Sequence, residues 1–215
     1  DLYVAKAEAL IEHHPRGTAI SLNVKDDQRV EKLVAQSDLV ISLLPFSFHV
    51  KIAKLCLKHG THLVTASYVS NEMRALDAEA KENGLLLLNE IGFDPGIDHM
   101  SAMKIIDDTK NQGGKIISFE SCCGGLPAPE VNDNPFGYKF SWSPRGVVMA
   151  GRNAAQFYKD GERVSVNGED LFKNYWPKMV KSLGDLEVYP NRDSLLYKEL
   201  YGLEGINTLF RGTFR

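Results

Sequence analysis

DLVISLLPF, residues 38–46, contains a nearly continuous apolar run at 39–44, and Pro45 ends it. An apolar run of this length predicts a β-strand that is covered on both faces, as strands in parallel sheets are. Further strands are predicted at 18–24, 62–65 and 85–88. They alternate with helices, which are predicted at the ranges 2–14, 26–35, 49–59 and 70–82.

This alternation of strands and helices with short connections predicts an α/β fold. The chain shows no G-x-G-x-x-G loop between a strand and a helix. Gly113 and Gly114 end a helix that begins near Asp98, and a longer strand follows at 115–123. We therefore expect domains at 1–113 and 114–215, the second of α+β type with helices near 146–158 and 170–182.

Composition excludes several classes of protein. Hydrophobic residues make up 43% and charged residues 25% of the chain, which are ordinary proportions for a folded domain. A net charge of −3 without a basic cluster argues against nucleic-acid binding, and no apolar stretch approaches the roughly 20 residues that span a bilayer. The six histidines and three cysteines show no metal-binding spacing, so no metal site is expected.

The ends of the predicted strands carry the candidate site, because ligands of parallel sheets bind at the carboxyl ends of the strands. Small residues at Ala66 and Ser67 allow a flat cofactor to approach, and Tyr68 adds an aromatic hydroxyl. Asp94 could accept a proton, and His99 is a second candidate for proton transfer. Asp98 is expected to cap the following helix.

Two arginines in turn-like stretches, Arg192 and Arg211, suggest carboxylate recognition, since the guanidinium fork binds carboxylates bidentately. Cys122 and Cys123 are followed by two glycines, but no base or helix end that would activate a thiol is identifiable, so they are expected to be structural.

Seven segments in order resemble the glutamate-forming saccharopine dehydrogenase family, which also forms the last domain of aminoadipic semialdehyde synthase. They are DLVISLLPF (38–46), LVTASYVS (63–70), NEIGFDPGIDHMSAM (89–103), CCGGLPAPE (122–130), NPFGYKFSWSPRGV (134–147), YPNRDS (189–194) and LFRGTFR (209–215). The resemblance implies a Rossmann-type parallel sheet that lacks its first βα unit, the one that carries the G-x-G-x-x-G loop, followed by an α+β substrate and dimerisation domain. It also implies an NAD(P)-dependent oxidoreductase of lysine metabolism. It would convert saccharopine and water to glutamate and 2-aminoadipate 6-semialdehyde by hydride transfer from the amine-bearing carbon to NAD or NADP.

The resemblance also implies roles for particular residues. Asp94 would be catalytic. Cofactor contacts would be Asn23, Val24 and Leu44 on the adenine side, Ala66, Ser67, Phe93, Asp94 and Pro95 on the nicotinamide side, with Ser143 and, at the ribose, Asp1. Saccharopine contacts would be Tyr68, Val69, Arg192, Arg211, Gly212 and Thr213.

A homodimer in the cytoplasm or the mitochondrial matrix would follow from the same resemblance, with the second domain serving substrate binding and dimerisation. Because segments of the family are missing at both ends, we expect this chain alone to bind cofactor poorly, and it could be inactive. Two alternatives stay open: a related polyamine dehydrogenase of the carboxynorspermidine type, and a truncated, non-catalytic dimerisation module.

Overall fold

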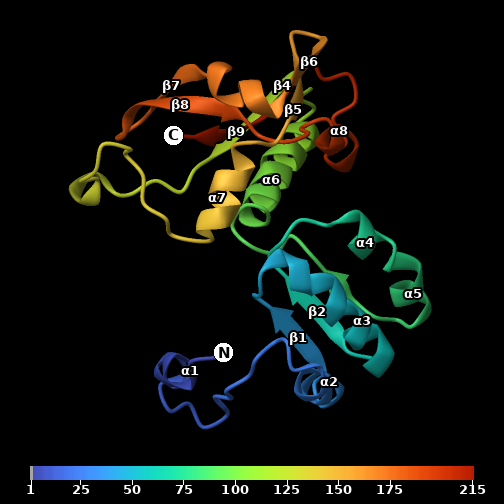
Figure 1. Cartoon of the computed structure of the whole chain (residues 1–215). Coiled ribbons are helices and arrows are strands. Elements are labelled where there is room, and N and C mark those ends of the chain that lie inside the picture. The colour runs from blue at the N-terminus through green and yellow to red at the C-terminus, as the bar shows by residue number, and fades with distance from the viewer. Residues whose placement is uncertain (1) are drawn as a thin grey trace. The chain divides into compact units, whose positions relative to one another are not determined.

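The computed structural model describes residues 2–215, which form two compact units, one extending to Ile97 and the other from Asp98 to Arg215 (Figure 1). Each unit has its own β-sheet. The predicted combination of a parallel-sheet domain with an α+β domain is confirmed.

The first unit is built on a parallel sheet in the order β1-β2-β3. Its strands are β1 (Leu39–Ser42), β2 (His62–Thr65) and β3 (Leu87–Leu88). The helices of this unit are α1 (Val4–Ile11), α2 (Asp27–Ala35), α3 (His49–His59), α4 (Asn71–Arg74) and α5 (Asp77–Glu82). The apolar side of α3, with Ile52, Ala53 and Cys56, packs in one core with Leu63 of β2.

Helix ends in this unit follow local capping chemistry. The Asp26 side chain accepts a hydrogen bond from Arg29 N at the start of α2, and Ser70 accepts one from Met73 N at the start of α4. Gly60, at φ 70°, ends α3 in the left-handed conformation that glycine adopts without strain. The helix predicted at 70–82 is thus divided into α4 and α5, with Ser70 as the N-cap of the first.

The strand predicted at residues 18–24 is wrong, because this segment is irregular. A strand needs a neighbour that shares its backbone hydrogen bonds, and within residues 2–215 no strand pairs with this segment. Its bonds are local instead: Ser21 O accepts from Arg29 Nη2, and Asn23 O accepts from Asp26 N in a turn. Composition alone overstated the tendency to form a strand here.

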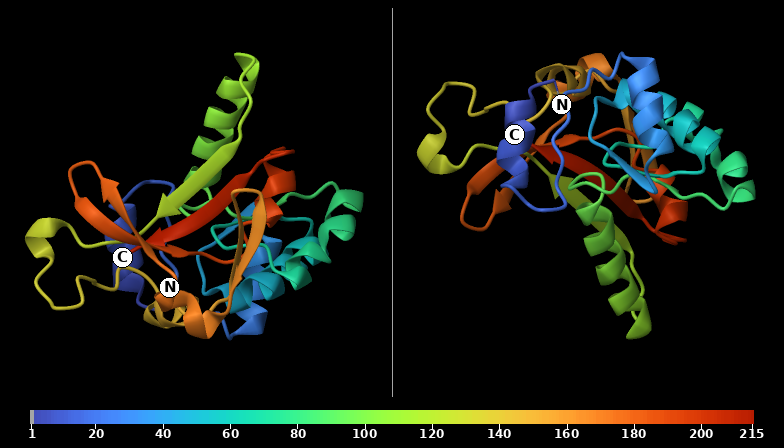
Figure 2. Two further views of the ribbon diagram at one scale, coloured as in Figure 1. Left: turned by 90° about the horizontal axis from the view of Figure 1, so that it is seen from above. Right: turned by 90° about the horizontal axis from the view of Figure 1, so that it is seen from below.

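The second unit is organised around β9 (Thr208–Phe214). The whole length of β4 (Ser118–Cys123) pairs with β9 in parallel. Figure 2 shows these two strands side by side. The other side of β9 pairs antiparallel with β8 and, at one position, with β5. The remaining strands are β5 (Ala155–Lys159), β6 (Glu162–Val166), β7 (Trp176–Val180) and β8 (Gly184–Pro190).

Long-range packing explains the differences from prediction in this unit. The helix predicted at 170–182 is wrong, because the 3₁₀ helix η3 (Gly168–Lys173) is followed by β7, which pairs with β8. The helix predicted at 146–158 is shorter, as α7 (Pro144–Ala150), and β5 follows it. The two compact units meet at the start of α6 (Ile97–Asn111), whose Ala102 and Ile106 pack with Leu209 of β9, whereas the predicted domain ranges 1–113 and 114–215 divide the chain after this helix.

Replacing a fully buried leucine of β9 should destabilise the second unit. Leu209 is 0% exposed, so Leu209→Ala should lower the free energy of unfolding by about 2–5 kcal/mol through lost burial and a residual cavity. Leu200→Ala at the end of α8 (Leu196–Leu200) is the matched control, because Leu200 is 68% exposed and should change stability by about 0.5 kcal/mol or less. Equal losses for both variants, measured by urea denaturation, would contradict this packing.

Candidate active site and cofactor pocket

Two loops at the carboxyl end of the parallel sheet are tied together by hydrogen bonds. The loop after β2 provides the backbone oxygens of Thr65 and Ser67, which accept from Ile91 N at 3.2 Å and from Glu90 N at 3.1 Å. The Tyr68 hydroxyl donates to Asp94 Oδ1 at 2.9 Å. The predicted nicotinamide-side residues in the loops 66–69 and 93–95 are therefore neighbours, although their roles remain predictions.

Glu90 was missed by the sequence analysis and fixes the same pair of loops. Its Oε1 accepts a hydrogen bond from Val69 N at 3.0 Å, and its φ of 59° is unusual for a residue other than glycine. A carboxylate placed directly after a buried strand was the available signal, because a charged residue there needs a partner. Glu90 therefore holds the backbone beside Tyr68.

The loop after β3 turns back on itself so tightly that it needs glycine. Gly92 N donates to Pro95 O at 2.8 Å, and a Cβ on Gly96 would lie 2.0 Å from Gly92 O. A Cβ on Gly92 would approach the Ala66 Cβ to 3.0 Å. Small residues are thus required where the two loops meet, which leaves Asp94 at the outer end of the turn.

Behind these loops lies a buried histidine that contacts three hydroxyl groups. His49, at the first position of α3, is 4% exposed; its Nδ1 lies 3.0 Å from Ser42 Oγ. Its Nε2 lies 3.0 Å from Thr65 Oγ1 and 2.8 Å from Ser67 Oγ. Burial lowers the pKa of His49, which favours the neutral ring. The sequence analysis predicted no role for this histidine.

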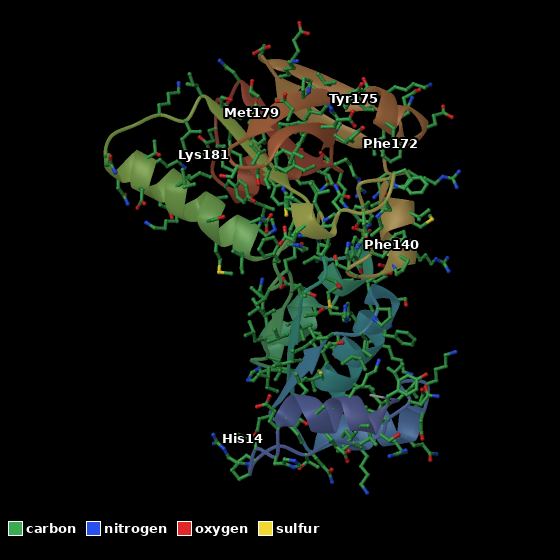
Figure 3. All side chains as sticks on the ribbon, turned by 90° about the vertical axis from the view of Figure 1, so that its left-hand side faces the viewer. His14, Phe140, Phe172, Tyr175, Met179 and Lys181 are labelled. Atoms are coloured by element: carbon green, nitrogen blue, oxygen red, sulfur yellow. The ribbon has the colours of Figure 1, made fainter. Side chains whose placement is uncertain are left out.

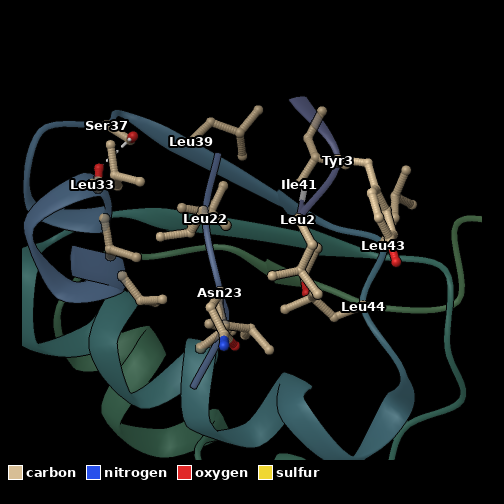
Figure 4. A pocket seen from close by; sticks show the side chains of 16 residues that line it. Leu2, Tyr3, Leu22, Asn23, Leu33, Ser37, Leu39, Ile41, Leu43 and Leu44 are labelled. Carbon is tan, nitrogen blue, oxygen red and sulfur yellow. Dashed lines mark hydrogen bonds between the residues drawn. The ribbon is translucent and has the colours of Figure 1, made fainter. Parts of the chain in front are cut away.

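A cavity of about 630 Å³ opens beside β1 and gathers the three predicted adenine-side residues, Asn23, Val24 and Leu44. Figure 4 shows Leu22, Asn23 and Leu44 around this space. Most of the lining side chains are apolar, which suits the faces of a heteroaromatic base, while the Asn23 amide can hydrogen-bond its edge. The adenine-side role of these residues stays a prediction.

The second unit holds a buried ion pair between residues 98 and 211. Arg211 is 4% exposed, and its Nη2 donates to Asp98 Oδ2 at 2.6 Å. The guanidinium also lies 4.3 Å from the centre of the Tyr197 ring. Asp98 is thus not the N-cap that the sequence predicted, because α6 begins at Ile97 and the Asp98 carboxylate pairs with Arg211.

His99 belongs to an aromatic cluster in the same unit. Its Nδ1 lies 2.6 Å from the Tyr201 hydroxyl, and its ring stacks on Tyr197 with centroids 5.3 Å apart. These contacts support a structural role for His99 and leave Asp94 as the first candidate for proton transfer.

The other predicted substrate residues lie on or beside two paired strands. Gly212 and Thr213 of β9 are opposite Pro190 and Tyr189 of β8, and Asn191 N donates to Arg211 O at 2.9 Å. Arg192 follows β8 and is exposed, with a φ of 55°. The second unit therefore brings the predicted saccharopine contacts of 192 and 211–213 into one region.

Two predicted cofactor residues are not joined to these groups. Ser143 caps α7 by accepting from Gly146 N at 3.1 Å, which gives it a structural function in the second unit. Asp1 lies outside the described residues. Among residues 2–215, no group of three potential ligands is arranged to hold a metal ion, and no helix is long and apolar enough to cross a membrane.

Family models match both units. The model described as saccharopine dehydrogenase NADP binding domain matches residues 1–88, and that described as saccharopine dehydrogenase C-terminal domain matches residues 92–215. A parallel sheet whose strands alternate with helices, matched by an NADP-binding model, is a dinucleotide-binding fold. With more than half of its residues matched by one of these models, the chain belongs to the saccharopine dehydrogenase family.

Individual relatives agree with this assignment. The chain is 48% identical over 213 residues to saccharopine dehydrogenase (NADP(+), L-glutamate-forming) of Saccharomyces cerevisiae, covering 99% of this chain and 47% of the yeast protein. Mitochondrial alpha-aminoadipic semialdehyde synthase of Mus musculus is 44% identical, covering 91% of this chain and 21% of the mouse protein. The chain thus spans about half the length of the fungal relatives it matches.

A solved structure shows the same fold. Apo saccharopine dehydrogenase (L-Glu forming) from Saccharomyces cerevisiae superposes with a TM-score of 0.87 at 47% identity, covering 99% of this chain and 48% of that one.

Removing one partner of the buried ion pair should lower the free energy of unfolding far more than removing an exposed acid does. Asp98→Ala should lower the free energy of unfolding by about 3–5 kcal/mol, because it leaves the Arg211 charge buried without this carboxylate. Asp108→Ala, which removes an exposed acid from the same helix, should cost about 1 kcal/mol or less. Thermal or urea unfolding would measure both, and equal effects would argue against a buried pair.

Proposed function

We propose that the protein oxidises saccharopine with NADP⁺ and water to L-glutamate, 2-aminoadipate 6-semialdehyde and NADPH. The observation that carries this proposal is the junction of the loops 65–69 and 89–96, where Tyr68 bonds Asp94. The match to the NADP-binding family model supports NADP as the cofactor, which would accept the hydride. The relatives described above support saccharopine over a polyamine-linked substrate such as carboxynorspermidine.

In this proposal Asp94 and Tyr68 accept and transfer the proton that leaves the substrate amine. Asp94 is half-buried, and its carboxylate already accepts the Tyr68 hydroxyl, so the two side chains can relay a proton to or from water. The cavity at Asn23, Val24 and Leu44 would hold the adenine, with Ala66, Ser67, Phe93 and Pro95 beside the nicotinamide.

Saccharopine carries three carboxylates, and the second unit supplies cationic and neutral donors for them. Arg192 is exposed and can offer its guanidinium fork to a carboxylate. Arg211 is already paired with Asp98, so its position is preset before substrate arrives, and Thr213 adds a hydroxyl donor beside Gly212. Val69 of the first unit would contact the substrate through its side chain, because its N–H already donates to Glu90 Oε1. We assign Arg192 the main role in substrate affinity.

The assembly and compartment belong to the same proposal. Exposed apolar side chains at Phe172, Tyr175 and Met179 of the second unit support a homodimer, whose sedimentation mass would be twice that of one chain (Figure 3). A form fused like the mouse relative would act in the mitochondrial matrix, and a free-standing form in the cytoplasm.

The substrate assignment predicts a specific kinetic effect. In the full-length protein, Arg192→Ala should raise the KM for saccharopine roughly 10- to 100-fold, since a hydrogen bond to a charged group contributes about 1.5–3 kcal/mol. The KM for NADP⁺ should stay unchanged. Arg152→Ala is the matched control, because Arg152 is also exposed in the same unit.

The assay follows NADP⁺ reduction at 340 nm with saccharopine, and with carboxynorspermidine for comparison. Reduction with carboxynorspermidine alone would replace the proposal by the polyamine alternative, and no reduction with either substrate would favour a non-catalytic module.

A further inference from the structure

His49 is placed to control the loop that follows β2. Its ring connects three segments of the first unit: the end of β1 through Ser42, the start of α3, and the loop after β2 through Thr65 and Ser67. The ring is 4% exposed, so these contacts form away from bulk water, where a lost hydrogen bond is costly.

The hydroxyl contacts fit a neutral ring that carries its proton on Nδ1. Thr65 Oγ1 accepts from Ser67 N at 3.3 Å, so its own proton can be donated, and His49 Nε2 lies 3.0 Å away. If Nε2 accepts this bond, the single proton of the neutral ring lies on Nδ1 and is donated to Ser42 Oγ at 3.0 Å. The buried hydroxyls of Ser42 and Thr65 thus each find a partner in the ring.

We propose that His49, in the Nδ1–H form, is a positioning residue that holds Ala66 and Ser67 in the conformation that receives the nicotinamide half of the cofactor. This inference rests on the proposed function and deepens it. The Nε2 contacts fix the backbone turn at Thr65 and the Ser67 side chain. The same turn leads directly to Tyr68, so a displaced loop would also disturb the bond from Tyr68 to Asp94.

Two conservative variants separate positioning from simple packing. A glutamine side chain places its amide near the site of Nε2, whereas an asparagine places its amide near the site of Nδ1. His49→Gln therefore retains a partner for Thr65 and Ser67, and His49→Asn retains one only for Ser42.

The experiment measures NADPH affinity by fluorescence titration of the full-length protein and its variants, with thermal unfolding in parallel. We expect His49→Asn to weaken NADPH binding about tenfold, and His49→Gln to remain within about twofold of the native protein, from the size of one hydrogen bond. Equal weakening by the two variants, or unchanged affinity in both, would overturn the proposal.

A spectroscopic measurement keeps the proposal testable if His49→Asn fails to fold. A long-range ¹H–¹⁵N spectrum of the native protein at pH 7 should show His49 protonated on Nδ1 and unprotonated on Nε2, and the opposite tautomer or a charged ring would overturn the assignment.

Neither readout requires saccharopine. A protein that binds NADPH as expected but does not oxidise saccharopine would therefore refute the proposed substrate while leaving the role of His49 standing.

Discussion

Backbone hydrogen bonds between the loop after β2 and the loop after β3 are the constraint on which the first unit's candidate site depends. Parallel strands of β1, β2 and β3 bring their carboxyl ends to one edge, but that alone would leave the loops free to diverge. The bonds of Glu90 and Ile91 to the loop 65–69 prevent this, and Gly92 and Gly96 allow the close approach. Tyr68 and Asp94 meet as a result.

In the second unit, strand β9 has the corresponding role. It is the only described strand that pairs with three others, and it carries Arg211, Gly212 and Thr213 into the region where β8 ends. The buried pair of Arg211 with Asp98 holds the guanidinium in place at the cost of removing both groups from water. A buried ion pair adds little net stability to a fold, so we interpret this pair as one that fixes the position of the Arg211 guanidinium.

Sequence patterns predicted the elements that depend on local information. The boundaries of α3 and β2 were predicted as observed, because helical apolar spacing that stops at Gly60 specifies α3 and a short β-rich run specifies β2. The strand expected at 18–24 was wrong, because no described strand pairs with this segment. The helix expected at 170–182 was wrong, because residues of this segment form β7 and pair with β8. Likewise, the sequence predicted candidate site residues near the strand ends. It did not predict the hydrogen-bond partners of Asp98, Glu90 and His49, because most of those contacts join segments far apart in sequence.

The most direct test of the account is a crystal structure of the full-length protein with NADP⁺. We expect the nicotinamide ring to lie in van der Waals contact with Ala66 or Ser67 and with the loop 93–95. We expect the adenine to lie beside Asn23 and Leu44. A nicotinamide ring bound away from both loops would contradict the central claim that their junction forms the reaction site.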